Sequence, residues 1–498
     1  MKASRPAACA LAAQILLTAC TATAHSPQVW PEPRPPAPQQ QPFARSYPNF
    51  QAPSATDCRR PVALREEPGH AGPQHRPPPP PLHDHHAARE SALADSAAAG
   101  RSRHEKSSAE RRAHAESATP APAAAAAPQL QRSAPAHDGV PQPPQQPREL
   151  QRQHPVVTAG VVDDNADFRE YLAFRQRTHV AHRPRDVRER YLLEVKDARG
   201  RGIADAEVAV QAPSGHAMWA RTDGAGRAWL HPNAFDPWRS SHYDVLVRKD
   251  GRQAMTQLVR GQKSAVEAVL EARPADARAR LDLVFLIDAT GSMADEIDKL
   301  KATLRTITAE VAALPTRPDI CLGLVAYRDR GDAFLLRAHD FTDDVGDFLR
   351  QALLPLRAGG GGDYAEAMNE ALHETVHQLS WRGDGATRMV ILLADAPPHL
   401  DYGAPHYDED MLAALGKGIK IFGVGASGLD KQGEYIQRQM AQYTGGKFVF
   451  LTYADARHPA SGPGRDTVHD VKNYSVDTLD RLVVRLVAEE LAKRDAGR

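Results

Sequence analysis

The chain has 498 residues with 40 prolines and only 6% aromatic residues, and its four cysteines are too few for a disulfide-dense scaffold. Its 62 basic residues balance 62 acidic residues, so it has no long-range field toward polyanions, which excludes a role in coating nucleic acid. Its longest apolar stretch, near the N-terminus, is shorter than the ~20 residues that cross a bilayer, which excludes an integral membrane protein.

The first residues have the layout of a secretory signal peptide. Lys2 and Arg5 precede an apolar run from Ala7 to Leu17. The sequence that follows, Leu17-Thr18-Ala19-Cys20, resembles the lipobox of bacterial lipoproteins. The resemblance implies a lipoprotein signal peptide over residues 1–19 and a lipid on Cys20.

This lipid would hold the protein in the bacterial cell envelope and would be its only contact with a membrane. Thr21 stands where an aspartate would retain a lipoprotein at the inner membrane, so we expect the outer membrane. The alternative is an ordinary signal peptide that is cut near Ala24.

Residues 20–150 are dominated by Pro, Ala, His, Arg and Gln. Such a composition buries too little apolar surface to offset chain entropy, and it predicts a disordered tether. Cys58 falls in this segment and is expected to be unpaired. The run His83-Asp84-His85-His86 is typical of a weak, non-selective metal binder.

Two folded parts follow the tether. Residues 151–190 predict a helical lead-in, with a helix between Asp164 and Arg177. Residues 191–272 alternate between apolar and polar positions and contain turn sequences, which predicts a small antiparallel β-sandwich. The stretches Gly202 to Val208 and Thr222 to Ala228 resemble the carboxypeptidase-regulatory or transthyretin-like family, which implies an accessory module.

The last part, residues 280–496, alternates short apolar runs with helical patterns. Near-continuous apolar strands between helices predict an α/β fold with a doubly wound, mostly parallel sheet that is covered on both faces. Ligands of such sheets bind at the carboxyl ends of the strands. Cys321 lies inside one apolar run and is interpreted as a small buried hydrophobic residue.

Polar side chains gather at three of these predicted ends. They are Asp288, Thr290 and Ser292 in the first loop, Asp363 and Glu366 after four glycines in the second, and Asp395 in the third. Carboxylate and hydroxyl oxygens are what a hard divalent cation prefers. The alternative is that these residues only cap helices, since Ser, Thr and Asp favour that position.

At these loops the chain resembles the von Willebrand factor type A family, whose metal-ion-dependent adhesion site uses an Asp-x-Ser-x-Ser loop, a hydroxyl from a second loop and an aspartate from a third. The resemblance implies Mg²⁺, with Mn²⁺ or Ca²⁺ as alternatives, and a non-enzymatic role in which a partner's acidic side chain completes the metal shell. Thr290 preserves the first hydroxyl. In the second loop Asp363 or Glu366 replaces the hydroxyl, which weakens the expected attraction for an acidic partner.

Two other hypotheses stay open. Residues 373–377, His-Glu-Thr-Val-His, match the zinc-peptidase pattern, so one alternative is a zinc-dependent hydrolase that uses His373, Glu374 and His377. The apolar stripe of the predicted helix points both histidines toward solvent, which argues against this reading. The other alternative is a scaffold whose metal site is vestigial.

Overall fold

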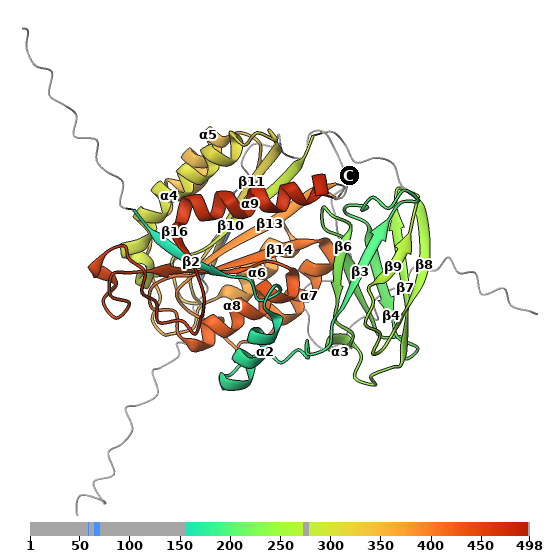
Figure 1. The fold of residues 1–498 in the computed structure, drawn as a ribbon. Helices are drawn as coiled ribbons and strands as arrows, with labels where there is room; N and C mark the ends of the chain where they lie inside the picture. The colour runs from blue at the N-terminus through green and yellow to red at the C-terminus, as the bar shows by residue number, and fades with distance from the viewer. Residues whose placement is uncertain (1–57, 59–63, 70–155, 272–277, 384, 497–498) are drawn as a thin grey trace, which may run out of the picture. The chain divides into compact units, whose positions relative to one another are not determined.

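The structure is a computed structural model that describes Cys58 and residues 64–69, 156–271, 278–383 and 385–496. The predicted signal peptide, Cys20 and most of the predicted tether lie outside the described residues. Figure 1 shows the fold, coloured from the N-terminus to the C-terminus.

The segment predicted as a sandwich folds into two sheets. The first has the order β6-β3-β9 and the second the order β5-β4-β7-β8. The strands are β3 (Tyr191–Lys196), β4 (Glu207–Gln211), β5 (Ala217–Arg221), β6 (Arg227–Leu230), β7 (His242–Lys249), β8 (Arg252–Val259) and β9 (Val266–Val269), with helix α3 (Pro232–Phe235) after β6. Residues of both sheets, such as Val195 and Val208, share one apolar cluster. All pairs are antiparallel except β3 with β9, which is parallel.

The rest of the described chain is built on one nine-stranded sheet. From edge to edge its strands are β1 (Leu64–Glu67), β12 (Leu336–Thr342), β11 (Asp319–Tyr327), β10 (Arg280–Asp288), β13 (Ala386–Ala394), β14 (Ile419–Gly425), β15 (Phe448–Thr452), β2 (Thr158–Val162) and β16 (Val476–Thr478). The five strands from β11 to β15 in this order are parallel, and β1, β12 and β2 are antiparallel to their neighbours. The predicted mostly parallel α/β fold is confirmed.

Helices cover both faces of this sheet (Figure 1). One face carries α4 (Ala294–Ala312), η2 (Phe348–Leu353) and α9 (Leu479–Ala496), and the other carries α6 (Met368–His377), α7 (Tyr407–Lys417) and α8 (Lys431–Thr444). Successive side chains of β10 alternate between the two cores, with Val284 and Leu286 in one and Leu283 and Phe285 in the other. No helix among the described residues is long and apolar enough to cross a membrane.

The lead-in is only partly helical. Helix α2 (Phe168–Arg177) forms where the sequence predicts a helix, and its N-cap Asp167 accepts a hydrogen bond from the Glu170 backbone N–H. The prediction missed strand β2, which pairs with β15 and with the short strand β16. Phe174 of α2 packs against the ring of Tyr435 in α8, which fixes this segment to the α/β part.

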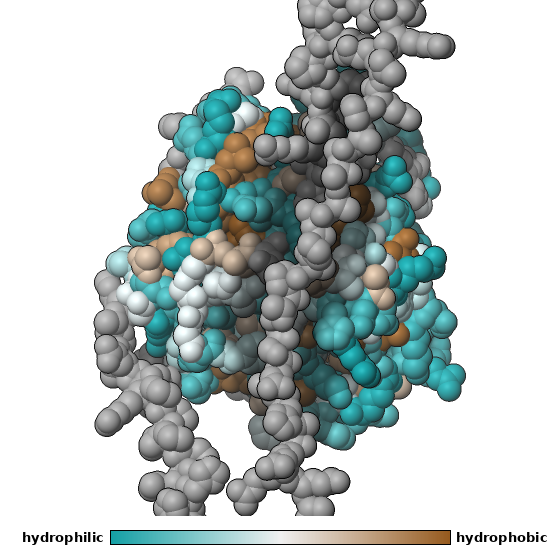
Figure 2. Space-filling view, turned by 90° about the vertical axis from the view of Figure 1, so that its left-hand side faces the viewer, coloured by the Kyte–Doolittle hydropathy of each residue, from teal (hydrophilic) through white to brown (hydrophobic). Residues whose placement is uncertain are grey.

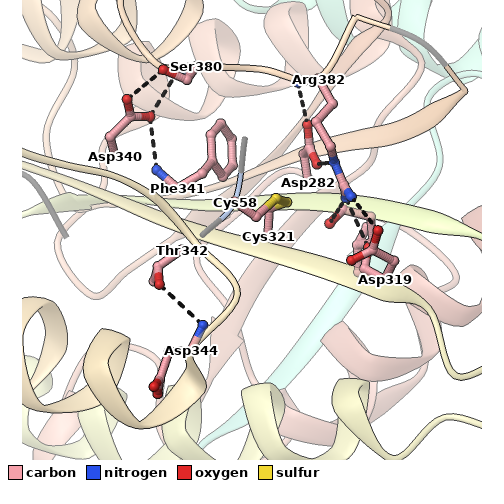
Figure 3. Close-up of a disulfide and its surroundings, with 11 residues drawn as sticks. Cys58, Asp282, Asp319, Cys321, Asp340, Phe341, Thr342, Asp344, Ser380 and Arg382 are labelled. Carbon is pink, nitrogen blue, oxygen red and sulfur yellow. Dashed lines mark hydrogen bonds and ion pairs between the residues drawn. A yellow bond between two sulfur atoms is a disulfide. The ribbon is translucent and has the colours of Figure 1, made fainter. Parts of the chain in front are cut away.

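The prediction that Cys58 is unpaired is wrong, and Cys321 is buried as predicted but is part of a disulfide. Cys58 forms a disulfide with Cys321 of β11, with a Cα–Cα separation of 5.5 Å (Figure 3). The segment after it, Leu64–Glu67, forms edge strand β1, which is antiparallel to β12. The predicted tether is therefore interrupted by a stretch that belongs to the folded sheet.

The surface in Figure 2 is mostly hydrophilic, and apolar residues form separate patches on it. The large apolar side chains that are exposed in the described chain include Trp238, Met255 and Val269 of the sandwich, at 75%, 54% and 63%.

Candidate metal centre

The candidate site lies where loops meet at the carboxyl ends of the parallel strands. Asp288 is the last residue of β10, and Asp395 directly follows β13, its parallel neighbour. Neighbouring parallel strands end at the same edge of a sheet, so both carboxyl groups reach one region. The glycine-rich loop before α6 is joined to the first loop by a hydrogen bond from the Gly291 N–H to the Gly360 carbonyl, at 3.0 Å.

The first loop presents two hydroxyl groups beside one carboxylate. The backbone N–H and the hydroxyl of Thr290 donate to Asp288 Oδ1, at 2.9 and 2.7 Å. The Ser292 hydroxyl lies 3.0 Å from the Thr290 hydroxyl. Asp288 and Thr290 are fully buried, whereas Ser292 is exposed, so the site is open on the Ser292 side.

Three carboxyl groups are buried here. Asp288, Glu366 and Asp395 are 0%, 3% and 4% exposed. One oxygen of each is buried and has no hydrogen-bond partner among the described residues: Asp288 Oδ2, Glu366 Oε2 and Asp395 Oδ1. Leaving a buried acceptor unsatisfied costs about 1–3 kcal/mol, and more for a charged group, so these three oxygens are available to a ligand that could offset this cost.

Repulsion between these groups points to a positive ligand. Burial, together with the neighbouring Asp395 charge, raises the pKa of Asp288 to about 7. Burial raises the pKa of Glu366 to about 10, again with a contribution from Asp288. Burial also raises the pKa of Asp395, although a hydrogen bond from Ser292 opposes this rise. A bound divalent cation would offset both the burial of these charges and the repulsion between them. A donor set made only of oxygens suits Mg²⁺.

The second loop brings Glu366 rather than Asp363 to the centre. The Glu366 N–H donates to the Pro397 carbonyl at 3.0 Å, and Glu366 forms a β-bridge with Pro398 in the third loop. A Cβ atom on Gly361 would lie 3.1 Å from Glu366 Oε1 and 3.3 Å from Thr290 Cβ. Glycine is therefore needed where this loop passes the two ligands.

Asp363 lies in a neighbouring acidic group instead. It is exposed, and its carboxylate lies within 4.8 Å of ligand atoms of Asp329 and His399. Of the six predicted ligands, the structure thus brings five together and sets Asp363 beside them.

Two aspartates at the rim of the site, Asp329 and Asp332, are not among the predicted ligands. Asp332 Oδ2 accepts hydrogen bonds from the Gly361 N–H at 2.8 Å and from the Asp329 N–H at 3.1 Å, which fixes the glycine loop. Arg328, which precedes Asp329, donates hydrogen bonds to the Ala289 and Arg357 carbonyls. The signal in the sequence was the pair of aspartates that follow β11.

The zinc-peptidase motif is placed differently from the prediction. His373 and His377 are 2% and 8% exposed, so the expectation that both face solvent is wrong. Each lies 3.0 Å from Asp410 Oδ1 of helix α7. Glu374, the position of the general base in such peptidases, accepts two hydrogen bonds from Arg65 of β1.

Comparison with known protein families identifies the part of the chain that carries the site. Residues 282–455 match the von Willebrand factor type A domain. This range includes every residue of the candidate metal centre, so the loop motif and the family match point to the same part of the chain. These residues form a von Willebrand factor type A domain.

Curated relatives match only in a limited region. The chain is 31% identical over 120 residues to the alpha-protein kinase vwkA of Dictyostelium discoideum, and 30% identical over 124 residues to a putative ariadne-like RING finger protein of Acanthamoeba polyphaga mimivirus. These matches cover 24% and 25% of this chain but only 19% and 12% of the relatives. A solved structure, the conserved hypothetical protein BatB from Bacteroides thetaiotaomicron, is 17% identical and covers 42% of this chain and 98% of its own, with a TM-score of 0.29.

Proposed function

We propose that this protein is a non-enzymatic binding protein of the bacterial envelope, whose von Willebrand factor type A domain holds a divalent cation and engages a protein partner there. Domains of this type generally mediate protein–protein interaction. The observation that carries the proposal is that Asp288, Glu366 and Asp395 each have a buried carboxylate oxygen without a partner among the described residues, and that burial and the charges of Asp288 and Asp395 raise the pKa of Glu366.

The cation is proposed to be Mg²⁺, held by these carboxylates together with the hydroxyl groups of Thr290 and Ser292. When bound, it would supply positive charge and an open coordination position. The exposed Ser292 side of the site is where a partner side chain would approach.

The charge of this centre bears on the partner. Three carboxylates and one divalent cation sum to −3 + 2 = −1, whereas two carboxylates with a hydroxyl in the second loop would sum to −2 + 2 = 0. An acidic partner side chain would meet this extra negative charge from Glu366. We therefore propose that this centre binds an acidic side chain more weakly than the family pattern implies. We also propose that the binding depends more strongly on salt concentration.

Anchoring through a lipid on Cys20 is proposed from the lipobox. The Cys58–Cys321 disulfide supports an extracytoplasmic location, since disulfides persist in oxidising compartments such as the periplasm. Cys20→Ala should move the protein from the membrane fraction to the soluble fraction after cell lysis, because the lipid is the proposed membrane contact. Unchanged fractionation in the presence of a chelator, which releases metal-dependent partners, would contradict the lipid anchor.

The partner proposal is tested by a pull-down from envelope extract. Wild-type protein should retain a partner in Mg²⁺ and release it in chelator, and Asp288→Ala should not retain it. Asp298→Ala is the matched control, because Asp298 lies on helix α4 with its side chain 86% exposed. Partner binding that survives both chelator and Asp288→Ala would favour the scaffold with a vestigial site.

A further inference from the structure

A second cluster of metal-ligating side chains lies outside the centre described above. It consists of His373 and His377 on α6 and Asp410 on α7, and we call it the His-Asp cluster. These residues are 2%, 8% and 0% exposed. Its donors are two imidazole nitrogens and one carboxylate, whereas the first centre offers only oxygens.

Helix geometry brings the two histidines together. Residues four positions apart lie on one face of a helix, and the two rings stack with centroids 4.5 Å apart. His373 Nδ1 and His377 Nε2 each lie 3.0 Å from Asp410 Oδ1. One ligand atom from each of the three residues lies within 4.8 Å of the others.

These separations suit a zinc-like ion. Zn²⁺ binds imidazole nitrogen and carboxylate oxygen at about 2.0–2.2 Å, which places two of its ligand atoms roughly 3.3 Å apart in a tetrahedral site. The observed 3.0 Å requires only a small opening of the cluster. We propose that the His-Asp cluster is a buried transition-metal site, with Zn²⁺ as its ion, which joins helix α6 to helix α7.

The surroundings favour a structural role over a hydrolytic one. The three ligands are buried, and Glu374 is hydrogen-bonded to Arg65 at 2.9 and 2.7 Å rather than aimed at the cluster. The neighbouring Lys417 side chain donates to the Val376 carbonyl at 2.6 Å. Burial lowers the pKa of Lys417 to about 7, which reduces the repulsion that its charge would exert on a cation.

The test is metal retention by the full chain, produced without a histidine tag. The protein is equilibrated with ZnCl₂, desalted, and analysed for zinc by mass spectrometry, and CoCl₂ is used in parallel to record visible d–d absorption. Wild type should retain about one zinc per chain, and the cobalt-loaded protein should show the d–d absorption of a Co²⁺ ion with few ligands. Asp410→Asn and His377→Gln should each weaken retention at least ~10-fold.

Two controls separate this site from others. Alanine substitution of His83, His85 and His86 removes the histidine run outside the described residues, and Asp298→Ala removes an exposed carboxylate of helix α4; neither should reduce zinc retention. If Asp410→Asn fails to fold, the wild-type titration still decides. The proposal is overturned if wild type retains no zinc and gives no cobalt spectrum, or if retention is unchanged in folded Asp410→Asn. In either case the cluster is only a buried hydrogen-bond network.

Discussion

Arg65 donates two hydrogen bonds to Glu374 Oε1, at 2.9 and 2.7 Å, although 309 positions separate the two residues. Near it, Glu66 pairs with Arg337 of β12, and the Leu335 N–H donates to the Glu67 carbonyl at 2.8 Å. The contacts involve exposed side chains, so each ion pair contributes little on its own. Together with the disulfide they fasten β1 to the edge of the sheet.

Removing the disulfide should lower the stability of the folded part. Cys58 and Cys321 close a segment with a sequence separation of 263 residues, and the crosslink restricts the unfolded chain. We expect Cys58→Ser with Cys321→Ser to reduce the free energy of unfolding by about 3 kcal/mol in denaturant titrations. A reducing agent should destabilise wild type and leave the double variant unaffected. Equal stability of oxidised wild type and the variant would show that the crosslink does not act this way.

Gly361 should be required for cation binding. Its φ of +72° strains any residue other than glycine, and a Cβ would lie 3.1 Å from Glu366 Oε1, so this carboxylate would have to shift. Gly361→Ala should weaken Mg²⁺ binding measured by calorimetry and cost about 1 kcal/mol in stability. Gly362→Ala is the matched control, because a Cβ there meets no atom within 4 Å. Equal Mg²⁺ affinity in the two variants would contradict the placement of the loop.

Acid should destabilise the protein through His231. This ring is fully buried, stacks on Tyr443 and has no hydrogen-bond partner in the described chain. Burial lowers the pKa of the His231 ring from 6.5 to about 3, so between these pH values the unfolded state is protonated and the folded state is not. Stability should fall as pH drops from 6.5 toward 3, by at most about 1.4 kcal/mol per pH unit from this group.

His231→Phe keeps an aromatic ring at the position and removes this titration. Chemical denaturation at several pH values should therefore give a shallower decline for the variant than for wild type. Identical slopes would mean that His231 is protonated as easily in the folded state as in the unfolded state.

Asp205 should be among the most sensitive charged residues. Its Oδ1 accepts hydrogen bonds from Arg221 Nε at 2.6 Å and from Arg388 Nη1 at 2.9 Å, and all three residues are buried. Asp205→Asn removes the charge that two buried guanidinium groups share, although Arg221 keeps its pair with Glu207, and should cost about 3 kcal/mol. Glu194→Gln, which removes pairs with the exposed Arg227 and the partly exposed Lys196, should cost at most about 1 kcal/mol. Similar losses in both variants would refute this ranking.

The parallel strands could be predicted because a strand that is buried on both faces needs apolar residues at successive positions. Runs such as Leu283 to Ile287 show this pattern. Strands β1 and β12, which lie at one side of the sheet, were missed for the opposite reason. Strand β1 consists of four exposed residues, and β12 contains His339 and Asp340, so neither shows a hydrophobic pattern. The Cys58–Cys321 pairing joins distant segments, and no local spacing reports it.

The residues of the candidate centre divide in the same way, into those with a local sequence signal and those placed by contacts between distant segments. Asp288, Thr290 and Ser292 could be predicted because they follow a buried strand at a fixed spacing. The choice between Asp363 and Glu366 depended on a contact between loops, the bridge of Glu366 with Pro398, which has no local signature. The burial of His373 and His377 depended on Asp410, which lies on another helix and contacts one nitrogen of each ring.

The most direct test of the account is the effect of Mg²⁺ on the melting temperature of wild type and Asp288→Asn, an isosteric change that removes one ligand charge. Binding to the folded state alone stabilises it by RT ln(1 + [L]/Kd), about 2.7 kcal/mol at a hundredfold excess over Kd. Mg²⁺ should therefore raise the melting temperature of wild type and of the exposed control Asp298→Ala, and leave that of Asp288→Asn unchanged. Equal shifts in all three proteins, or no shift in wild type at millimolar Mg²⁺, would contradict a cation site at Asp288.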